Sequence, residues 1–407
     1  MAYTETTTTS WFSRIKNSFA GVLTGIGLII GGTCLLWWNE GDFVATRDAL
    51  IEAQKVTEEM PDISSVNAEM NGKVVHATGK ATTSDVLTDP DFRVSATAIS
   101  LQRRVEFYQW VERSKTETKK ELGGKEVTTT TYTYEKKWVS RPVDSSGFHD
   151  PSARREHVNR TRMNVKNESI YAKNVAFGAY RLPDFFIREI STDPDFTISM
   201  TAEARDALAR RLVPAARTSE EALDGARELV QVHTKGLYIG KDPTLPRIGD
   251  LRVTYAAALP AEVSIIAKVA GDTFTRYAAS NGKTVSRLSM GTKGLEEMFN
   301  DAHSGNSTMT WILRAVGVAA VIAGLRMVVA PLSVLVGFIP FLETIVGGGF
   351  GFVCLLLGLA WSCIVISIAW IFYRPILAFG LIAVAIALIV LLYMRGRRRK
   401  AAEAQPV

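Results

Sequence analysis

The sequence predicts a membrane protein that combines four transmembrane helices with one large α+β domain outside the cytosol. Two apolar segments carry the first part of this prediction: an uncharged run over residues 17–38 and a block over residues 311–394. Residues 39–310 between them are rich in polar and charged side chains and contain patterns typical of both strands and helices. A segment of that length can bury one or two ordinary hydrophobic cores.

The first apolar run is predicted to be transmembrane helix 1. Its 22 residues cover roughly 33 Å as a helix, which matches the ~30 Å hydrocarbon thickness of a bilayer. The alternative is a cleaved signal peptide, because Arg14 and Lys16 precede the run. Signal-peptide cores are shorter and end at small residues, whereas this run ends in Trp37 and Trp38, so a retained anchor is favoured.

The C-terminal block is too long for a single crossing. Backbone groups cannot remain unpaired in lipid, so the block must be helical. We divide it into transmembrane helix 2 over residues 311–330, helix 3 over residues 345–372 and helix 4 over residues 375–394.

The basic residues predict the orientation of these helices. Arg14 and Lys16 precede the first span, and a basic cluster follows the last: Arg395, Arg397, Arg398, Arg399 and Lys400. Positive charge stays on the cytosolic side, so residues 1–16 form a short cytosolic N-terminus and residues 395–407 a basic cytosolic tail. Residues 39–310 then lie on the other side. The tail is expected to attract anionic lipid headgroups. Nucleic acid is not an expected partner, because the net charge of +6 belongs to the membrane ends.

The first half of the outer domain is predicted to contain a helix and a long β-hairpin. Helix-forming residues from Asp42 to Met60 predict a helix that leaves the membrane, and residues 72–83 predict a strand. The hairpin runs over residues 105–121 and 126–138, joined at Gly123-Gly124, which is a strong turn signal.

The second half is predicted to be mixed. Helices are expected over residues 201–212 and 219–232, the latter with a capping-box spacing from Thr218 to Glu221. Residues 249–277 return to a strand pattern. Extended segments recur along the domain without a fixed period, which leaves repeated subdomains open.

One cluster of residues invites a catalytic interpretation. Ser145, Ser146, His149 and Asp150 lie within six residues, and these residue types make up catalytic triads. Triad members meet through tertiary folding, however, whereas this stretch is typical of a turn with Phe148 inserted in the core. We therefore expect no catalytic residue here.

Metal and cofactor sites are likewise not expected. Two Asp-Pro-Asp triplets could offer carboxylates to a hard cation but are explained better as turns: Asp89 with Asp91, and Asp193 with Asp195. No nucleotide-binding glycine loop follows a predicted strand. Three asparagines begin N-glycosylation sequons on the predicted outer side: Asn159, Asn167 and Asn306.

Charges inside the C-terminal block predict anchoring rather than conduction. Arg314 and Arg374 lie near predicted outer ends of spans, and Arg326 lies near an inner end, where long side chains reach water. A channel or transporter would place polar groups through the midplane.

Glycines of the first span predict close helix contacts. Gly21 with Gly25, and Gly27 with Gly31, have the small-xxx-small spacing that lets backbones approach. We expect this span to pack against the C-terminal spans or against a second copy. All three cysteines, Cys34, Cys354 and Cys363, lie in predicted spans, so disulfides do not hold the outer domain together.

Several short motifs resemble those of the LUMA family of four-span membrane proteins, known from the animal inner nuclear membrane and also from bacteria. The motif residues, which we expect to be structural or to mediate interactions, are Trp38, Asn39, Glu40, Gly41, Trp110, Asp144, Ser145, Ser146, Phe148, Pro151, Gly249, Asp250, Arg374 and Pro375. The resemblance runs nearly end to end. It implies the topology given above and a scaffold that associates with itself and with other envelope proteins, as animal members do with emerin and lamins.

These observations together predict a non-enzymatic membrane scaffold or organiser whose outer domain mediates protein association. The alternative is a sensor of envelope or membrane state that relays to the cytosol, and a channel, a transporter or an outer-domain hydrolase is less favoured. The expected location is a bacterial inner membrane with a periplasmic domain. The alternative location is the endoplasmic reticulum and inner nuclear membrane, with the domain in the lumen.

Overall fold

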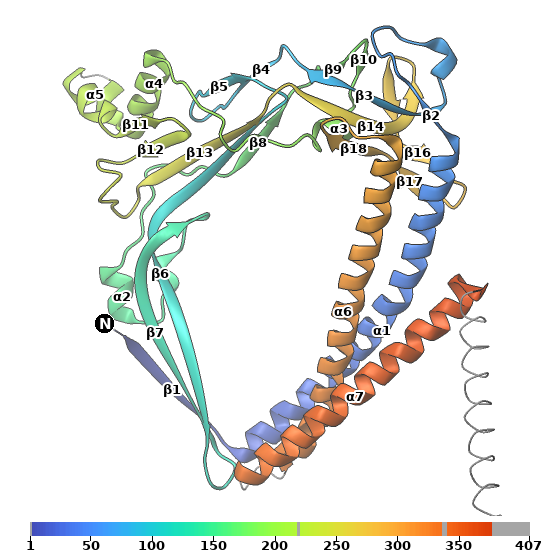
Figure 1. Cartoon of the computed structure of the whole chain (residues 1–407). Helices are drawn as coiled ribbons and strands as arrows, with labels where there is room; N and C mark the ends of the chain where they lie inside the picture. Colours follow the sequence, from blue (N-terminus) through green and yellow to red (C-terminus); the bar gives the residue numbers. More distant parts are fainter. Residues whose placement is uncertain (1, 218–219, 336–339, 377–407) are drawn as a thin grey trace, which may run out of the picture. The chain divides into compact units, whose positions relative to one another are not determined.

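The computed structural model describes residues 2–217, 220–335 and 340–376, with side chains omitted for residues 340–347. The chain forms two compact units. The sheet unit comprises residues 1–6, 52–117 and 129–300, and the helical unit comprises residues 7–51, 118–128 and 301–407. Figure 1 shows the elements of both.

The helical unit contains long apolar helices. They are α1 (Trp11–Val56), α6 (Leu295–Leu335) and α7 (Pro340–Tyr373). Each contains a stretch long and apolar enough to cross a membrane. The first three predicted spans fall within them, whereas the fourth, over residues 375–394, lies almost entirely outside the described residues.

Two of these helices are much longer than a bilayer crossing. With 46 and 41 residues, α1 and α6 extend over roughly 60–70 Å, about twice the hydrocarbon thickness. The predicted helix that leaves the membrane over residues 42–60 is the C-terminal part of α1, which continues through the predicted membrane exit without a break and ends at Val56 rather than at Met60. Asn39, Glu40, Gly41 and Asp42 interrupt the apolar run but not the helix.

Glycines join α1 to α6 at two levels. A Cβ atom at Gly25 would lie 2.7 Å from the carbonyl oxygen of Gly324, and one at Gly32 would lie 2.9 Å from that of Gly317. The spacing of seven residues on both helices repeats the contact two turns along. Each pair brings backbone against backbone, which a larger residue would prevent.

The predicted glycine pairs therefore contribute unequally to this packing. Gly25 lies at the interface, and Gly21 contacts only the tip of Met327. A Cβ atom at Gly27 or Gly31 would have no neighbour within 4 Å. Gly32, which was not among the predicted glycines, occupies the second contact instead.

The sheet unit is built around two seven-stranded sheets (Figure 1). The first has the order β1-β7-β6-β13-β12-β11, with β8 also paired to β6. Its strands are β1 (Tyr3–Thr9), β6 (Ser100–Lys120), β7 (Glu126–Val139), β8 (Glu168–Tyr171), β11 (Val230–His233), β12 (Gly236–Ile239) and β13 (Leu251–Ala258). The predicted hairpin is confirmed as β6 and β7, with Gly123 and Gly124 at positive φ in the turn.

The second sheet has the order β18-β14-β15-β10-β9-β3-β2, with a further pairing of β14 to β3. Its strands are β2 (Thr57–Glu59), β3 (Val74–Thr82), β9 (Ala176–Phe177), β10 (Tyr180–Arg181), β14 (Ala261–Ala270), β15 (Thr273–Thr275) and β18 (Arg287–Met290). Strand β3 comes from the first predicted extended segment and β14 from the last, so the two ends of the domain share one sheet. Serial subdomains do not describe this arrangement.

Short elements complete the sheet unit. Two small sheets pair β4 (Val86–Thr88) with β5 (Ser95–Thr97) and β16 (Tyr277–Ala278) with β17 (Thr284–Val285). The helices are α2 (Pro151–Glu156), α3 (Asp184–Ile187), α4 (Ala202–Leu212) and α5 (Glu220–Arg227). The predicted helix over residues 201–212 is confirmed, with Thr201 as its N-cap. The one predicted to reach residue 232 ends at Arg227, because Val230 begins strand β11.

The N-terminal residues contact the hairpin. Strand β1 pairs with β7, and the Tyr3 and Tyr132 rings lie 6.1 Å apart. Within the helical unit, Arg14 donates a hydrogen bond of 2.8 Å to the carbonyl of Gly124 and forms an ion pair of 3.2 Å with Glu126. The predicted sidedness places residues 1–16 and the hairpin on opposite faces of a membrane. If residues 17–38 cross a bilayer, the β1–β7 pairing and the Arg14 contacts with the hairpin cannot form, because their partners then lie on opposite sides of the membrane.

Candidate functional site

The motif Trp38-Asn39-Glu40-Gly41 lies on α1, where it meets α6 and α7. The Glu40 side chain is fully buried. It forms a bidentate ion pair with Arg314, with Nε–Oε1 and Nη2–Oε2 distances of 2.6 and 2.9 Å. Trp370 donates its indole N–H to Oε2 at 2.9 Å, and Arg374 approaches the same oxygen at 3.5 Å. We call these four residues the Glu40 cluster.

The neighbours of Glu40 reinforce the same junction. Asn39 donates its side-chain amide to the carbonyl of Thr310 at 3.1 Å. A Cβ atom at Gly41 would lie 2.8 Å from Cζ of Tyr373, so glycine leaves room here for the end of that side chain. Trp38, by contrast, is 56% exposed, as expected of a tryptophan at a membrane interface.

The two arginines of the Glu40 cluster also stack on aromatic rings. Arg314 lies 4.6 Å from the ring centre of Trp311, and Arg374 lies 4.3 Å from that of Phe43. The cluster contains two cations and one carboxylate, so its formal charge is +1. One carboxylate thus connects three helices in a region of low dielectric, where such pairs are strong only when hydrogen bonds satisfy them fully. The arrangement is suited to holding helices together.

A second group of motif residues meets in the sheet unit. Gln109 accepts a 2.6 Å hydrogen bond from the Val143 N–H. Asn159 accepts from the Trp110 N–H at 2.8 Å and donates to the carbonyls of Trp110 and Val143 at 2.9 and 3.1 Å. Its own backbone N–H donates to Ser145 Oγ at 2.9 Å. These residues, the amide junction, tie β6 to the two loops that flank α2.

Asp250 is fully buried beside the amide junction. It accepts from the Tyr238 hydroxyl at 2.8 Å and pairs with Arg162 at 2.9 Å. Burial and this carboxylate raise the pKa of Tyr238. Gly249 precedes it with φ of +98°, a conformation that glycine adopts readily, and donates its N–H to the Tyr108 carbonyl at 3.0 Å.

The candidate catalytic residues are all engaged in local structure. Asp144 accepts from the backbone and hydroxyl of Ser146, and Asp150 accepts from the Ser152 N–H to cap α2, which begins at Pro151. Phe148 is buried against Tyr134. His149 contacts Glu112, with Nδ1–Oε1 at 2.6 Å. Among the described residues, no hydrogen bond joins either serine of this stretch to His149.

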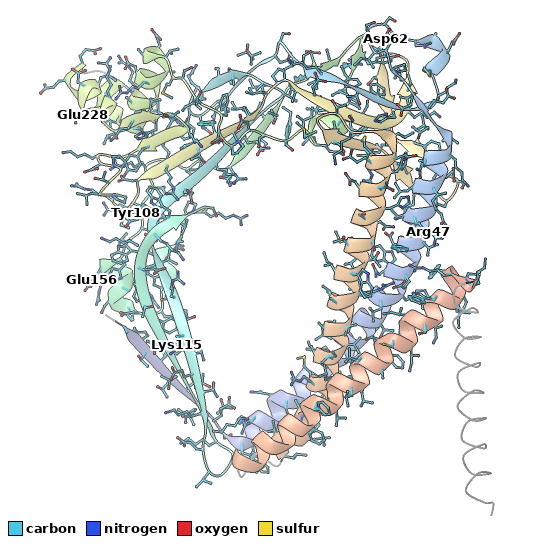
Figure 2. All side chains as sticks on the ribbon, viewed as in Figure 1. Arg47, Asp62, Tyr108, Lys115, Glu156 and Glu228 are labelled. Carbon is cyan, nitrogen blue, oxygen red and sulfur yellow. The ribbon has the colours of Figure 1, made fainter. Side chains whose placement is uncertain are left out.

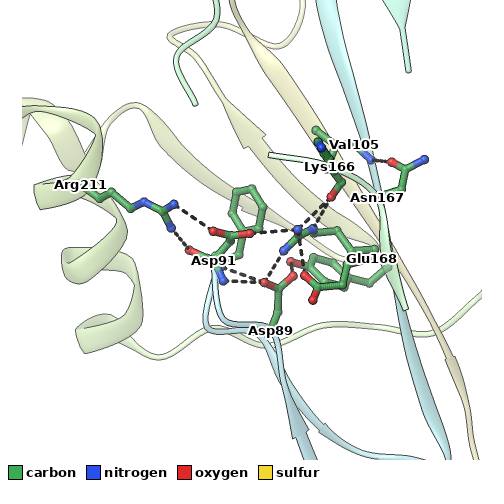
Figure 3. A network of polar contacts seen from close by, with 10 residues as sticks. Asp89, Asp91, Val105, Lys166, Asn167, Glu168 and Arg211 are labelled. Atoms are coloured by element: carbon green, nitrogen blue, oxygen red, sulfur yellow. Dashed lines mark hydrogen bonds and ion pairs between the residues drawn. The ribbon is translucent and has the colours of Figure 1, made fainter. Parts of the chain in front are cut away.

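The acidic triplets are turns, and one of them lies in a buried network (Figure 3). Asp89 accepts from the backbone N–H of Asp91, as Asp193 does from that of Asp195. Oxygen atoms of Asp89, Asp91 and Glu168 lie within 4.8 Å of one another, which would suit a cation. Their shared partner is Arg103, at 2.5, 3.0 and 3.1 Å. The guanidinium already supplies the positive charge that a metal would bring.

Sequence reasoning missed three contributors to these sites. Asn159 is a bridging amide, although the sequence marks it only as a sequon. Trp370 donates to Glu40 from within a uniformly apolar helix, and Arg103 lies in a strand with no local signal for a buried ion network. Each has at least one partner 49 or more positions away in the chain: Trp110 for Asn159, Glu40 for Trp370 and Lys166 for Arg103.

These features define a multi-pass membrane protein in which motif residues connect helices in one unit and strands and loops in the other. The family model for transmembrane protein 43 matches residues 107–375, and the chain belongs to this family, also called the LUMA family. It is 27% identical to transmembrane protein 43 of Pongo abelii and of Homo sapiens over 399 residues, covering 95% of this chain and 92% of each relative. The Drosophila melanogaster homolog is 26% identical, covering 89% of this chain and 91% of that relative. No solved structure matches the chain.

Proposed function

We propose that this protein is a non-enzymatic membrane scaffold whose sheet unit, on the non-cytosolic side, mediates association with a second copy or another envelope protein. The observation that carries the proposal is the use of the motif side chains. Glu40 and Asp250 are fully buried and form internal contacts between distant segments, and Gln109 and Asn159, which are not motif residues, do the same beside them. Internal contacts of this kind rigidify a framework, as a scaffold requires.

The hairpin is the best candidate for the surface that binds a partner. It is a long two-stranded ribbon with side chains on both faces around Lys115 (Figure 2). β7 lies next to the edge of its sheet, and only β1 covers it. If residues 1–16 lie in the cytosol, that edge is free, and a free edge accepts a strand from another chain.

Site-specific photo-crosslinking in intact membranes tests this proposal. A photoreactive amino acid replaces Thr133 or Lys136, both exposed on β7, and in a control it replaces Leu245, which is 71% exposed in a loop of the same unit. We expect a specific dimer or partner adduct from the β7 positions and none from position 245. Adducts at equal yield from all three positions, or none from β7, would contradict the proposal.

The proposed location is a bacterial inner membrane with the sheet unit in the periplasm, or an endoplasmic reticulum and inner nuclear membrane with the unit in the lumen. Both locations imply the same sidedness, with both chain ends in the cytosol or nucleoplasm. The basic tail, with Arg395 to Lys400, would then face anionic headgroups of the cytosolic leaflet.

A further inference from the structure

Arg326 is a cation inside the second predicted span, residues 311–330. It lies on α6, is exposed, and has no hydrogen bond or ion pair with any residue that the structure describes. Arg314 and Arg374, by contrast, share the Glu40 carboxylate. A charged side chain within a span is costly unless it finds a counter-charge or reaches the interface, so such residues mark functional sites.

The depth of Arg326 places its charge at the headgroup level. Four residues, about 6 Å of helix, separate it from residue 330, the predicted cytosolic end of its span. An arginine side chain reaches over that distance along apolar surface. The guanidinium therefore comes level with the phosphates of the cytosolic leaflet. This step rests on the proposed topology.

A hollow between α6 and α7 opens beside this guanidinium. Its volume is about 210 Å³, and apolar side chains of both helices, including Val329 and Phe350, line it together with Ser333. Gly351 of α7 makes the space, because a Cβ atom there would lie 2.6 Å from Nη2 of Arg326. The site thus combines a cation, a hydroxyl and apolar walls.

We propose that this hollow binds an anionic phospholipid of the cytosolic leaflet, with its phosphate on Arg326. A guanidinium presents paired N–H donors that match phosphate oxygens, and Ser333 adds a further donor. Basic pockets between transmembrane helices on the cytosolic side are a recurrent form of lipid headgroup site.

Native mass spectrometry of the full-length protein in detergent tests the proposal. Phosphatidylglycerol is titrated against phosphatidylcholine, and each bound lipid is counted. We expect one phosphatidylglycerol to be retained preferentially. Arg326→Gln should weaken its apparent affinity about fivefold, the ratio that corresponds to about 1 kcal/mol for one basic residue at an anionic surface. Arg326→Lys should retain most of the affinity, because it keeps the charge.

Two further variants separate the site from general electrostatics. Gly351→Leu fills the hollow and displaces the Arg326 guanidinium without removing its charge, and it should weaken phosphatidylglycerol binding as much as Arg326→Gln does. Arg398→Gln removes one cation from the tail and should leave this bound lipid in place. Equal retention of phosphatidylglycerol by wild type and Arg326→Gln would overturn the proposal. Displacement of the lipid by millimolar inorganic phosphate would overturn the assignment to a lipid and point to a soluble phosphate. Neither outcome bears on partner crosslinking through β7.

Discussion

Buried polar residues hold each unit of this protein together. The sequence predicts some of these residues but not their partners. Glu40 stands out in the sequence because it follows an apolar run, but its partners lie more than 270 positions away. Nothing local predicts that Arg314 and Trp370 converge on it. The sequence therefore predicts that Glu40 matters, and only the fold shows which residues act on it.

Removing the Glu40 charge should destabilise the helical unit strongly. Glu40→Gln leaves Arg314 buried without its carboxylate, and breaking a buried pair from one side costs about 3 kcal/mol or more. Denaturant titration of the purified protein in detergent, followed by tryptophan fluorescence, measures this loss. The matched control is Asp48→Asn on the same helix, where a half-exposed pair with Arg47 should cost less than about 1 kcal/mol.

The double variant Glu40→Gln with Arg314→Gln sharpens this test. Both charges are then removed, so the double variant should be less destabilised than the sum of the two single variants. Additive losses would show that the two side chains do not interact across α1 and α6.

Glu112 should make the sheet unit sensitive to acid. Burial alone would raise its pKa, but hydrogen bonds from Tyr134 and His149 outweigh burial and lower the pKa. A carboxylate whose pKa is lowered on folding stabilises the fold above its unfolded pKa, and that stability is lost as the pH falls through the folded value. Thermal melts should therefore show Tm decreasing below about pH 4.5, the ordinary glutamate value.

Two substitutions check that Glu112 is the source. Glu112→Gln should lower Tm at pH 7 and flatten part of its acid dependence. Glu228, labelled in Figure 2, is an exposed glutamate that has no hydrogen bond or ion pair among the described residues. Glu228→Gln should therefore leave the decrease of Tm below about pH 4.5 as it is in the wild type. If Tm decreases with acid identically in the wild type and in Glu112→Gln, other carboxylates cause the decrease.

At the scale of elements, local patterns predicted most of the fold. The Gly-Gly turn and the β-branched arms predicted the hairpin, although its first arm begins at Ser100 rather than at residue 105, and the helix predicted over residues 201–212 corresponds to α4. Errors occurred where tertiary context decides. The helix predicted to run to Met60 ends at Val56, because Thr57 begins strand β2, which pairs with β3. Pairing between strands as distant as β3 and β14 has no signature in a single sequence.

Glycine substitutions should separate the two faces of α1. Gly25→Ala places a Cβ 2.7 Å from the Gly324 carbonyl oxygen and should destabilise the helical unit by about 1–3 kcal/mol through overpacking. Gly27→Ala meets no atom within 4 Å and should be neutral or slightly stabilising, since alanine favours a helix. Denaturant titration in detergent compares the two. Equal effects would show that α1 and α6 do not pack through this face.

At the scale of the whole molecule, sidedness in the membrane is the decisive property. The sequence argues that residues 17–38 cross a bilayer, whereas β1 pairs with β7 and Arg14 binds the hairpin tip. The hairpin cannot follow these contacts through lipid, because its arms near the tip carry lysines and glutamates: Lys115, Glu117, Lys119, Lys120 and Glu121. Each charge at the membrane centre costs at least about 2.5 kcal/mol. We therefore expect the span to prevail and the β1–β7 pairing to be absent in a bilayer.

Cysteine accessibility distinguishes these arrangements directly. In a background with Cys34, Cys354 and Cys363 replaced by alanine, Thr7→Cys and Leu122→Cys are labelled in intact cells by a membrane-impermeant maleimide. Leu122 is 84% exposed at the hairpin tip, so its cysteine should react if it lies outside the cytosol. We expect label at position 122 in intact cells and at position 7 only after permeabilisation. Labelling of both positions before permeabilisation would place them on the same side of the membrane. This outcome would support the β1–β7 pairing and would mean that α1 does not cross the membrane over residues 17–38.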